Sequence, residues 1–229
     1  MTTRSESSCS SCLQMFSLVI VLAATANVLA EPILLSELIQ SNGHVVSGNS
    51  RFDQFAVLQT GDMPFPDAIN VMPIQDANGN FGIRFQGGFV DTVAPGPSEL
   101  TISYRATVLD ESQGLFTGAQ LAGNAVAVGQ ATVEVHVDLM GANLSEPLTI
   151  YDDSVAGTML LNSAMIHPGV VGANIDLFVS AESNAPLAAG TLSFIDMTFQ
   201  QTHMPEPNHV LSLTLMGAVF LLQRRKRRC

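Results

Sequence analysis

The sequence predicts an all-β protein, an antiparallel β-sandwich, and three observations lead to this prediction. Short segments from about residue 47 onward alternate apolar and polar side chains with the period of two that half-buried strands show. Gly, Pro, Asn and Asp separate these segments, and helical periodicity is almost absent. Many short strands joined by turns are typical of two packed antiparallel sheets.

One helix is expected near the start of this region. Pro32 suits the first turn of a helix, and the following stretch "ILLSELIQ" can continue it until Gly43 stops it.

The clearest strands are "LTISYRATV" at 100–108 and "ATVEVHVDL" at 131–139, each with one apolar and one polar face. The segment "TLSFIDMTF" at 191–199 groups Leu192 with Phe194 and Asp196, opposite Ile195 and Met197, which is compatible with burial on both sides. Further strands are predicted at 52–59, 68–73, 81–89, 148–151 and 175–180. Asn78-Gly79 between two of these predicts a tight hairpin.

The composition fits one globular domain with additional segments at its ends, because 47% of the 229 residues are hydrophobic. Between Glu31 and His203 there are three arginines and eighteen acidic residues, a net charge of -15. A surface of this sign repels phosphate, so nucleic acid is excluded as a partner of this region.

The three cysteines, Cys9, Cys12 and Cys229, all lie near the ends of the chain. The central region is therefore expected to contain neither a disulfide nor a catalytic thiol.

The first thirty residues have the pattern of a secretory signal peptide. Arg4 precedes an apolar run at 13–26, and the small residues Val28 and Ala30 come before Glu31, so cleavage is expected between Ala30 and Glu31. The alternative is an uncleaved anchor, although the run is shorter than the roughly 20 residues that a membrane span needs.

The last residues combine three features. Pro205, Glu206 and Pro207 precede an apolar stretch at 210–222, which as a helix would cover about 20 Å and form a short transmembrane helix. Five consecutive basic residues follow it: Arg224, Arg225, Lys226, Arg227 and Arg228. The positive-inside rule places this stop-transfer cluster in the cytoplasm and everything before it outside.

This arrangement resembles the PEP-CTERM sorting signal of Gram-negative bacteria, which exosortases recognise and process. The resemblance implies a signal peptide at 1–30, a β-sandwich ectodomain at 31–203 and a sorting and anchor segment at 204–229. It also implies an exosortase as partner, a membrane-anchored precursor, and a final place at the cell surface or in the extracellular matrix. The central region, through "VVSGNSRFDQF" and "GIRFQGGF", resembles a domain that recurs in exported PEP-CTERM proteins, and this second resemblance supplies no activity. An unprocessed tail anchor is the alternative for the C-terminus.

His136 and Asp138 lie two residues apart on one face of a predicted strand and could serve as metal ligands or as a base with its orienting carboxylate. His44 and His167 stand in loop-like sequence without a recognisable signature. We therefore favour the interpretation that His136 is an exposed strand residue.

The segment "DANGN" at 76–80 matches the opening of a calcium-binding loop. Phe81 and Gly87 occupy positions where the pattern needs a glycine and a glutamate, so a hairpin turn is favoured. Asp152 and Asp153 form another weak candidate pair for calcium, and calcium binding by the acidic surface stays open.

No catalytic residue, metal ligand or cofactor is assigned, because the sequence contains no nucleophile, zinc or phosphate-loop motif. The expected function is that of an exported, non-enzymatic protein with a structural or adhesive role, with exopolysaccharide as a further expected partner. The first alternative is a polysaccharide- or calcium-binding module, and the second is a secreted hydrolase. The absence of Trp and the presence of only two Tyr count against a lectin-like surface.

Overall fold

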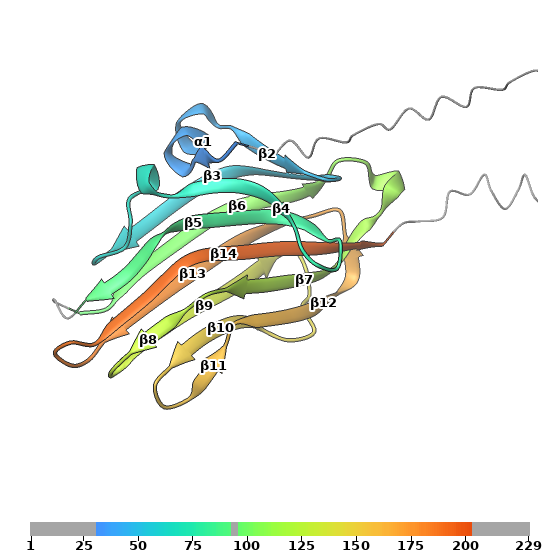
Figure 1. Ribbon diagram of the computed structural model, residues 1–229. Helices are drawn as coiled ribbons and strands as arrows, with labels where there is room; N and C mark the ends of the chain where they lie inside the picture. Colours follow the sequence, from blue (N-terminus) through green and yellow to red (C-terminus); the bar gives the residue numbers. More distant parts are fainter. Residues whose placement is uncertain (1–30, 93–95, 203–229) are drawn as a thin grey trace, which may run out of the picture.

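The computed structural model describes residues 31–92 and 96–202, which form two seven-stranded antiparallel sheets packed face to face (Figure 1). The predicted antiparallel β-sandwich is confirmed for these residues. The predicted signal peptide and C-terminal helix lie outside them. In the part of the chain that the structure describes, no helix has the length and apolarity needed to cross a membrane.

Sheet A contains the hydrogen-bonded strand order β1-β4-β5-β14-β7-β12, with β8 paired to β14. Its strands are β1 (Ile33–Leu34), β4 (Asn70–Gln75), β5 (Phe81–Thr92), β7 (Leu115–Gly123), β8 (Val126–Val128), β12 (Leu161–Val170) and β14 (Ala189–Thr202).

Sheet B has the order β11-β10-β9-β13-β6-β3-β2. Its strands are β2 (His44–Ser47), β3 (Ser50–Thr60), β6 (Ser98–Val108), β9 (Ala131–Met140), β10 (Leu148–Asp153), β11 (Gly157–Met159) and β13 (Gly172–Ser183). Two short 3-10 helices, η1 (Pro66–Ala68) and η2 (Glu111–Gln113), join strands of the two sheets.

The predicted helix exists, but both of its ends differ from the prediction. The chain first forms β1, in which Ile33 pairs with Val71 of β4, so α1 (Leu35–Ser41) begins later than Pro32. It ends at Asn42, which takes the left-handed conformation (φ 48°), while the Gly43 N–H donates to the Leu38 carbonyl at 2.8 Å. Asparagine tolerates this conformation better than most residues, which explains why the helix stops before the glycine.

The core lies between the two sheets and follows the predicted alternation. In β6 the side chains of Ile102, Tyr104 and Ala106 are buried, and in β9 those of Val133 and Val135 are buried. Aromatic rings from both sheets meet at the centre of this core: Phe52, Phe55, Phe85, Tyr104, Phe116 and Phe199.

β14 is a central strand of sheet A, with β5 on one side and β7 on the other. Its pairing register with β5 shifts between Leu192 and Phe194, and the Asn124 Oδ1 accepts the N–H groups of Ser193 (3.0 Å) and Phe194 (3.1 Å) at this bulge. Leu192 is therefore buried like Ile195, and the predicted grouping of Leu192 with Phe194 is wrong.

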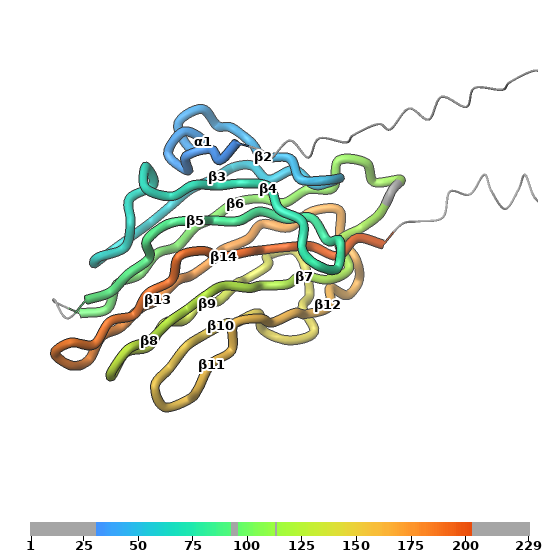
Figure 2. The backbone as a smooth tube through the Cα atoms, in the orientation of Figure 1, coloured from blue at the N-terminus to red at the C-terminus, as the bar shows by residue number. Residues whose placement is uncertain are grey.

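Several strands were not predicted. β7 and β12 are the long ones, and β1, β2, β8 and β11 are short. The strand predicted at 68–73 begins at Asn70, because Ala68 belongs to η1. The hairpin predicted at Asn78-Gly79 is confirmed, and its turn joins β4 to β5 (Figure 2).

Candidate functional site: a polar groove on sheet A

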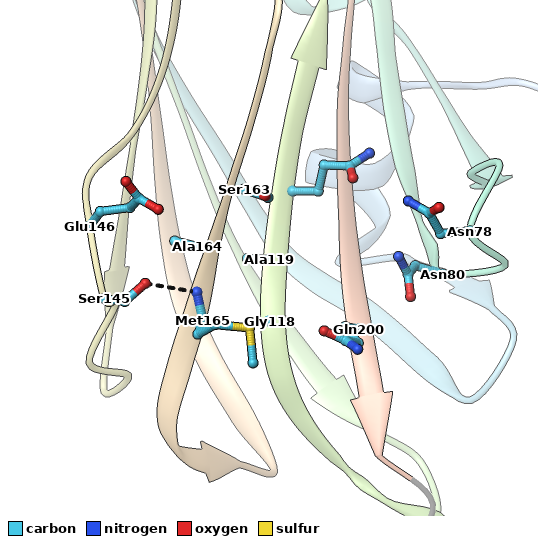
Figure 3. Close-up of a pocket in the computed structure, with 11 residues that line it drawn as sticks. Asn78, Asn80, Gly118, Ala119, Ser145, Glu146, Ser163, Ala164, Met165 and Gln200 are labelled. Carbon is cyan, nitrogen blue, oxygen red and sulfur yellow. Dashed lines mark hydrogen bonds between the residues drawn. The ribbon is translucent and has the colours of Figure 1, made fainter.

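A groove of about 410 Å³ lies on the outer face of sheet A, over β7, β12 and β14 (Figure 3). Its lining is mostly polar, and side chains with amide, hydroxyl or carboxylate groups dominate it. The residues that line it are Asn78, Asn80, Gly118, Ala119, Gln120, Ser145, Glu146, Ser163, Ala164, Met165 and Gln200.

Gly118 lies in the floor of the groove. This residue is paired with Met165 of β12 on one side and with Gln200 of β14 on the other. A Cβ atom at Gly118 would lie 3.0 Å from the Gln200 Oε1 and 3.4 Å from the Ala164 carbonyl oxygen. The neighbours of Gly118 are therefore closely packed, and a side chain there would press against Gln200. Met165, paired with Gly118 on β12, is 43% exposed.

The first wall is the β4–β5 turn, and the Asp76 carboxylate holds it together. Its Oδ1 accepts the N–H groups of Asn78 (2.8 Å) and Asn80 (2.9 Å). Its Oδ2 accepts the Asn80 side-chain amide (2.9 Å) and the Thr198 hydroxyl (3.0 Å). Gly79 completes the turn with φ 86°, a conformation that favours glycine.

These contacts also decide the protonation of Asp76. Burial by itself would raise the pKa of this carboxyl, but the hydrogen bonds from Asn80, Thr198 and Asn78 outweigh burial and lower the pKa. Asp76 is therefore an ionised acceptor that orders the turn, and the hairpin turn favoured over a calcium loop for 76–80 is confirmed.

The second wall is the segment at 141–147 between β9 and β10, which docks on the edge of β12. The Ser145 N–H donates to the Met165 carbonyl at 2.8 Å, and the Met165 N–H donates to the Ser145 Oγ at 3.0 Å. Leu144 forms an antiparallel bridge with Ile166. The exposed Glu146 side chain is thereby carried on the wall opposite Asn78 and Asn80, as Figure 3 shows.

The polar groups of the groove are largely free of partners in the protein. Among the described residues, the side-chain amides of Asn78, Gln120 and Gln200 have no hydrogen-bond partner, and neither does the Ser163 hydroxyl. Each amide offers donors and an acceptor that a ligand can use without breaking a bond of the fold.

His136 and Asp138 lie on sheet B, beside a second hollow of about 530 Å³ that shares Glu146 with the groove. The His136 Nε2 is 2.9 Å from the Asp138 Oδ1, and the Nδ1 is 3.1 Å from the Thr149 hydroxyl. Both ring nitrogens thus have partners within the sheet. His44 and His167 are exposed on β2 and β12, and neither shares this hollow.

Asp152 and Asp153 stabilise the β10–β11 hairpin. Asp152 accepts the Ala127 N–H at 2.7 Å and the Thr158 hydroxyl. Asp153 accepts the N–H groups of Ala156 and Val155 and the Thr132 hydroxyl, and the bonds from Ala156, Thr132 and Val155 lower its pKa. Within residues 31–92 and 96–202, no three His, Cys, Asp or Glu side chains are grouped so that they could hold a metal ion.

The predicted sorting and stop-transfer residues, and Ala30 of the cleavage site, lie outside the described residues, while Glu31 is the first residue within them. None of the groove residues on β7, β12 and β14 was predicted as a site residue. A signal that could have indicated them is the polar face of β14, on which Thr198 and Gln200 lie two residues apart.

The fold and this groove define a β-sandwich protein with a polar groove on one sheet. No family model matches the sequence, and no curated protein matches it. Three solved structures show limited similarity. A structure of TmCBM61 in complex with β-1,4-galactotriose has 12% identity and a TM-score of 0.32, with 64% of this chain and 89% of that chain covered.

The second is the enzymatically active domain of bacteriophage CBA120 tailspike protein 4, with 15% identity, a TM-score of 0.26, and 64% of this chain and 19% of that chain covered. The third is a glycoside hydrolase family 43 arabinoxylan arabinofuranohydrolase from Bacillus subtilis in complex with cellotetraose, with 11% identity, a TM-score of 0.22, and coverages of 57% and 33%.

Proposed function

We propose that this chain binds a polysaccharide, without cleaving it, in the groove on sheet A. The observation that carries the proposal is the set of side-chain amides of Asn78, Gln120 and Gln200, which face the groove and have no partner among the described residues. Sugar hydroxyls both donate and accept hydrogen bonds, and an amide side chain also does both.

The shape of the groove agrees with this ligand class. Its volume of about 410 Å³ falls within the range of roughly 300–1,000 Å³ of small-molecule sites. The exposed Met165 offers an apolar surface to the C–H groups of a sugar.

The groups at the groove favour binding over hydrolysis. Glycosidases generally place two carboxyl groups on either side of the bond that is cleaved. In the described part of the chain, Glu146 is the one carboxylate among the lining residues. The nearby Asp76 carboxylate is held by four hydrogen bonds, three within the turn and one from Thr198 of β14.

The proposal combines this binding with export. The predicted signal peptide and the predicted PEP-CTERM segment at 204–229 would place the domain outside the cytoplasm, where extracellular polysaccharide is found. An exosortase would process the precursor near Pro205-Glu206-Pro207, and the role of the mature protein would be structural or adhesive in the envelope or matrix.

Titration of the full-length chain against a panel of polysaccharides tests the binding. Gln200→Ala and Gln120→Ala should each weaken binding about five- to tenfold, because each removes hydrogen bonds to the ligand. Gln86→Ala is the matched control, since Gln86 is exposed on β5 of the same sheet and does not line the groove. Equal affinities for all three variants, or no binding to any polysaccharide, would contradict the proposal.

Export is tested separately. Replacing Pro205, Glu206 and Pro207 by alanine should block processing, which the intact mass of the native protein would reveal. A chain that lacks residues 204–229 should be released or mislocalised, and identical fractionation of the truncated and complete chains would refute the sorting hypothesis.

A further inference from the structure

We infer that the groove selects uncharged polysaccharides, and that Glu146 is the residue that discriminates against acidic sugars such as uronates. This inference rests on the proposed function and specifies the ligand class for the same groove. It follows from the charges around the groove and from the position of Glu146 in its wall.

Among the described residues, sheet A has one permanently charged cation, Arg84, and a carboxylate already pairs with it. Of the three arginines in the described residues, only Arg84 lies on sheet A, and both its Nε and its Nη2 donate to Asp196, at 2.6 and 2.7 Å. Arg51 and Arg105 lie on β3 and β6 of sheet B. An acidic sugar bound in the groove would therefore bring a charge that the described part of the sheet leaves uncompensated.

Glu146 adds a negative charge at the groove itself. Ser145 makes two hydrogen bonds with Met165, one of them through its hydroxyl, and they hold the segment that carries Glu146 at the rim of the groove (Figure 3). A carboxylate accepts strong hydrogen bonds from neutral hydroxyl groups but repels another carboxylate. The same side chain thus favours an uncharged sugar and disfavours a uronate.

Matched pairs of polymers with the same backbone test the selection. Dextran is compared with carboxymethyl dextran, hydroxyethyl cellulose with carboxymethyl cellulose, and methyl-esterified homogalacturonan with polygalacturonate. At low ionic strength the charged member of a binding pair should bind the full-length chain about fivefold or more weakly, and the difference should shrink at about 0.5 M salt, where charges are screened within a few ångströms.

Glu146→Gln removes the charge and keeps the shape of the side chain, so it should reduce the difference between the two polymers of a pair. Glu182→Gln is the control, because it changes the net charge equally at an exposed position on β13 of sheet B. Thermal melts of both variants establish that each is folded. Retained discrimination in Glu182→Gln and reduced discrimination in Glu146→Gln is the expected result.

Two outcomes would overturn the inference while leaving the proposed function in place. One is equal or tighter binding of the charged polymers, and the other is identical behaviour of the two variants, which would assign the selection to the net charge of the whole molecule. Failure of every polymer, charged or uncharged, to bind would overturn the proposed function and the inference with it.

Discussion

The Thr198 hydroxyl donates a hydrogen bond of 3.0 Å to the Asp76 carboxylate, and this contact joins the β4–β5 turn to the centre of β14. Thr198 is buried although it faces away from the core, because the turn covers it. The contact therefore sets the position of Asn78 and Asn80 relative to Gln200, across the groove.

Thr198→Val should loosen this wall. The change keeps the shape of the side chain and removes its donor, so we expect a loss of about 1 kcal/mol in the free energy of unfolding and a few-fold loss of polysaccharide affinity. Chemical denaturation and titration measure the two effects. Thr191→Val is the control on the same strand, where Thr191 is exposed; equal effects of both changes would show that the contact with Asp76 has no special role.

Stability should fall in acid partly because of Asp76. Its folded-state pKa lies below the ordinary value of 3.8, so the unfolded chain takes up the proton first as the pH falls. The contribution of this group is therefore complete above about pH 4 and is lost as the pH falls through the folded-state pKa. Carboxyl groups titrate between about pH 2 and pH 5. Urea denaturation over this range should show that the unfolding free energy falls less steeply with pH in Asp76→Asn than in the unchanged chain. An identical slope would argue against this role.

Gly82 should tolerate no side chain. A Cβ atom there would lie 2.0 Å from the Met197 carbonyl oxygen and 2.6 Å from the Thr198 Cα, which are backbone atoms of the neighbouring strand. Gly82→Ala should therefore cost about 3 kcal/mol of unfolding free energy or more. Gly88 lies on the same strand with no atom within 4 Å of its Cβ position, so Gly88→Ala should change stability by about 0.5 kcal/mol or less. A similar melting temperature for both variants would contradict the close approach of β5 and β14.

Arg84 should not be replaceable by lysine. Its guanidinium donates two hydrogen bonds to Asp196 and lies 4.3 Å from the centroid of the Phe194 ring, and the bond to Asp196 raises its pKa. Lysine keeps the charge but loses the paired bonds, so Arg84→Lys should lower stability by about 1 kcal/mol. Chemical denaturation, with Arg105→Lys on sheet B as the control, measures this loss. No difference between the two variants would show that charge alone suffices at residue 84.

The strands that sequence predicted well are those in which burial forces alternation. In β6 and β9, residues such as Ile102, Val133 and Val135 face the core, and the intervening polar residues face outward, so the period of two is visible without the structure. The bulge in β14 was not visible, because it depends on the distant Asn124 side chain.

The floor of the groove could not be predicted for a related reason. β7 contains Gly118, Ala119 and Gly123, which carry little strand preference, and β12 contains Pro168 and Gly169, which are typical of turns. Their pairing with β14 stabilises them instead. The part of the groove on β7 and β12 was not predicted because these two strands have a weak local signal. The export signals remain predictions.

The position of β14 in sheet A determines how the domain would respond to mechanical tension. β14 pairs with β5 through Ala189–Phe199 and with β7 through Ile195–Thr202, and it is the last strand before residue 203. A force applied to the C-terminal end would therefore act along β14, in the middle of sheet A, and would load these backbone hydrogen bonds together in shear. An edge strand pulled outward would instead lose one hydrogen bond at a time. In the proposed adhesive role, β5 and β7 would therefore share the load on β14.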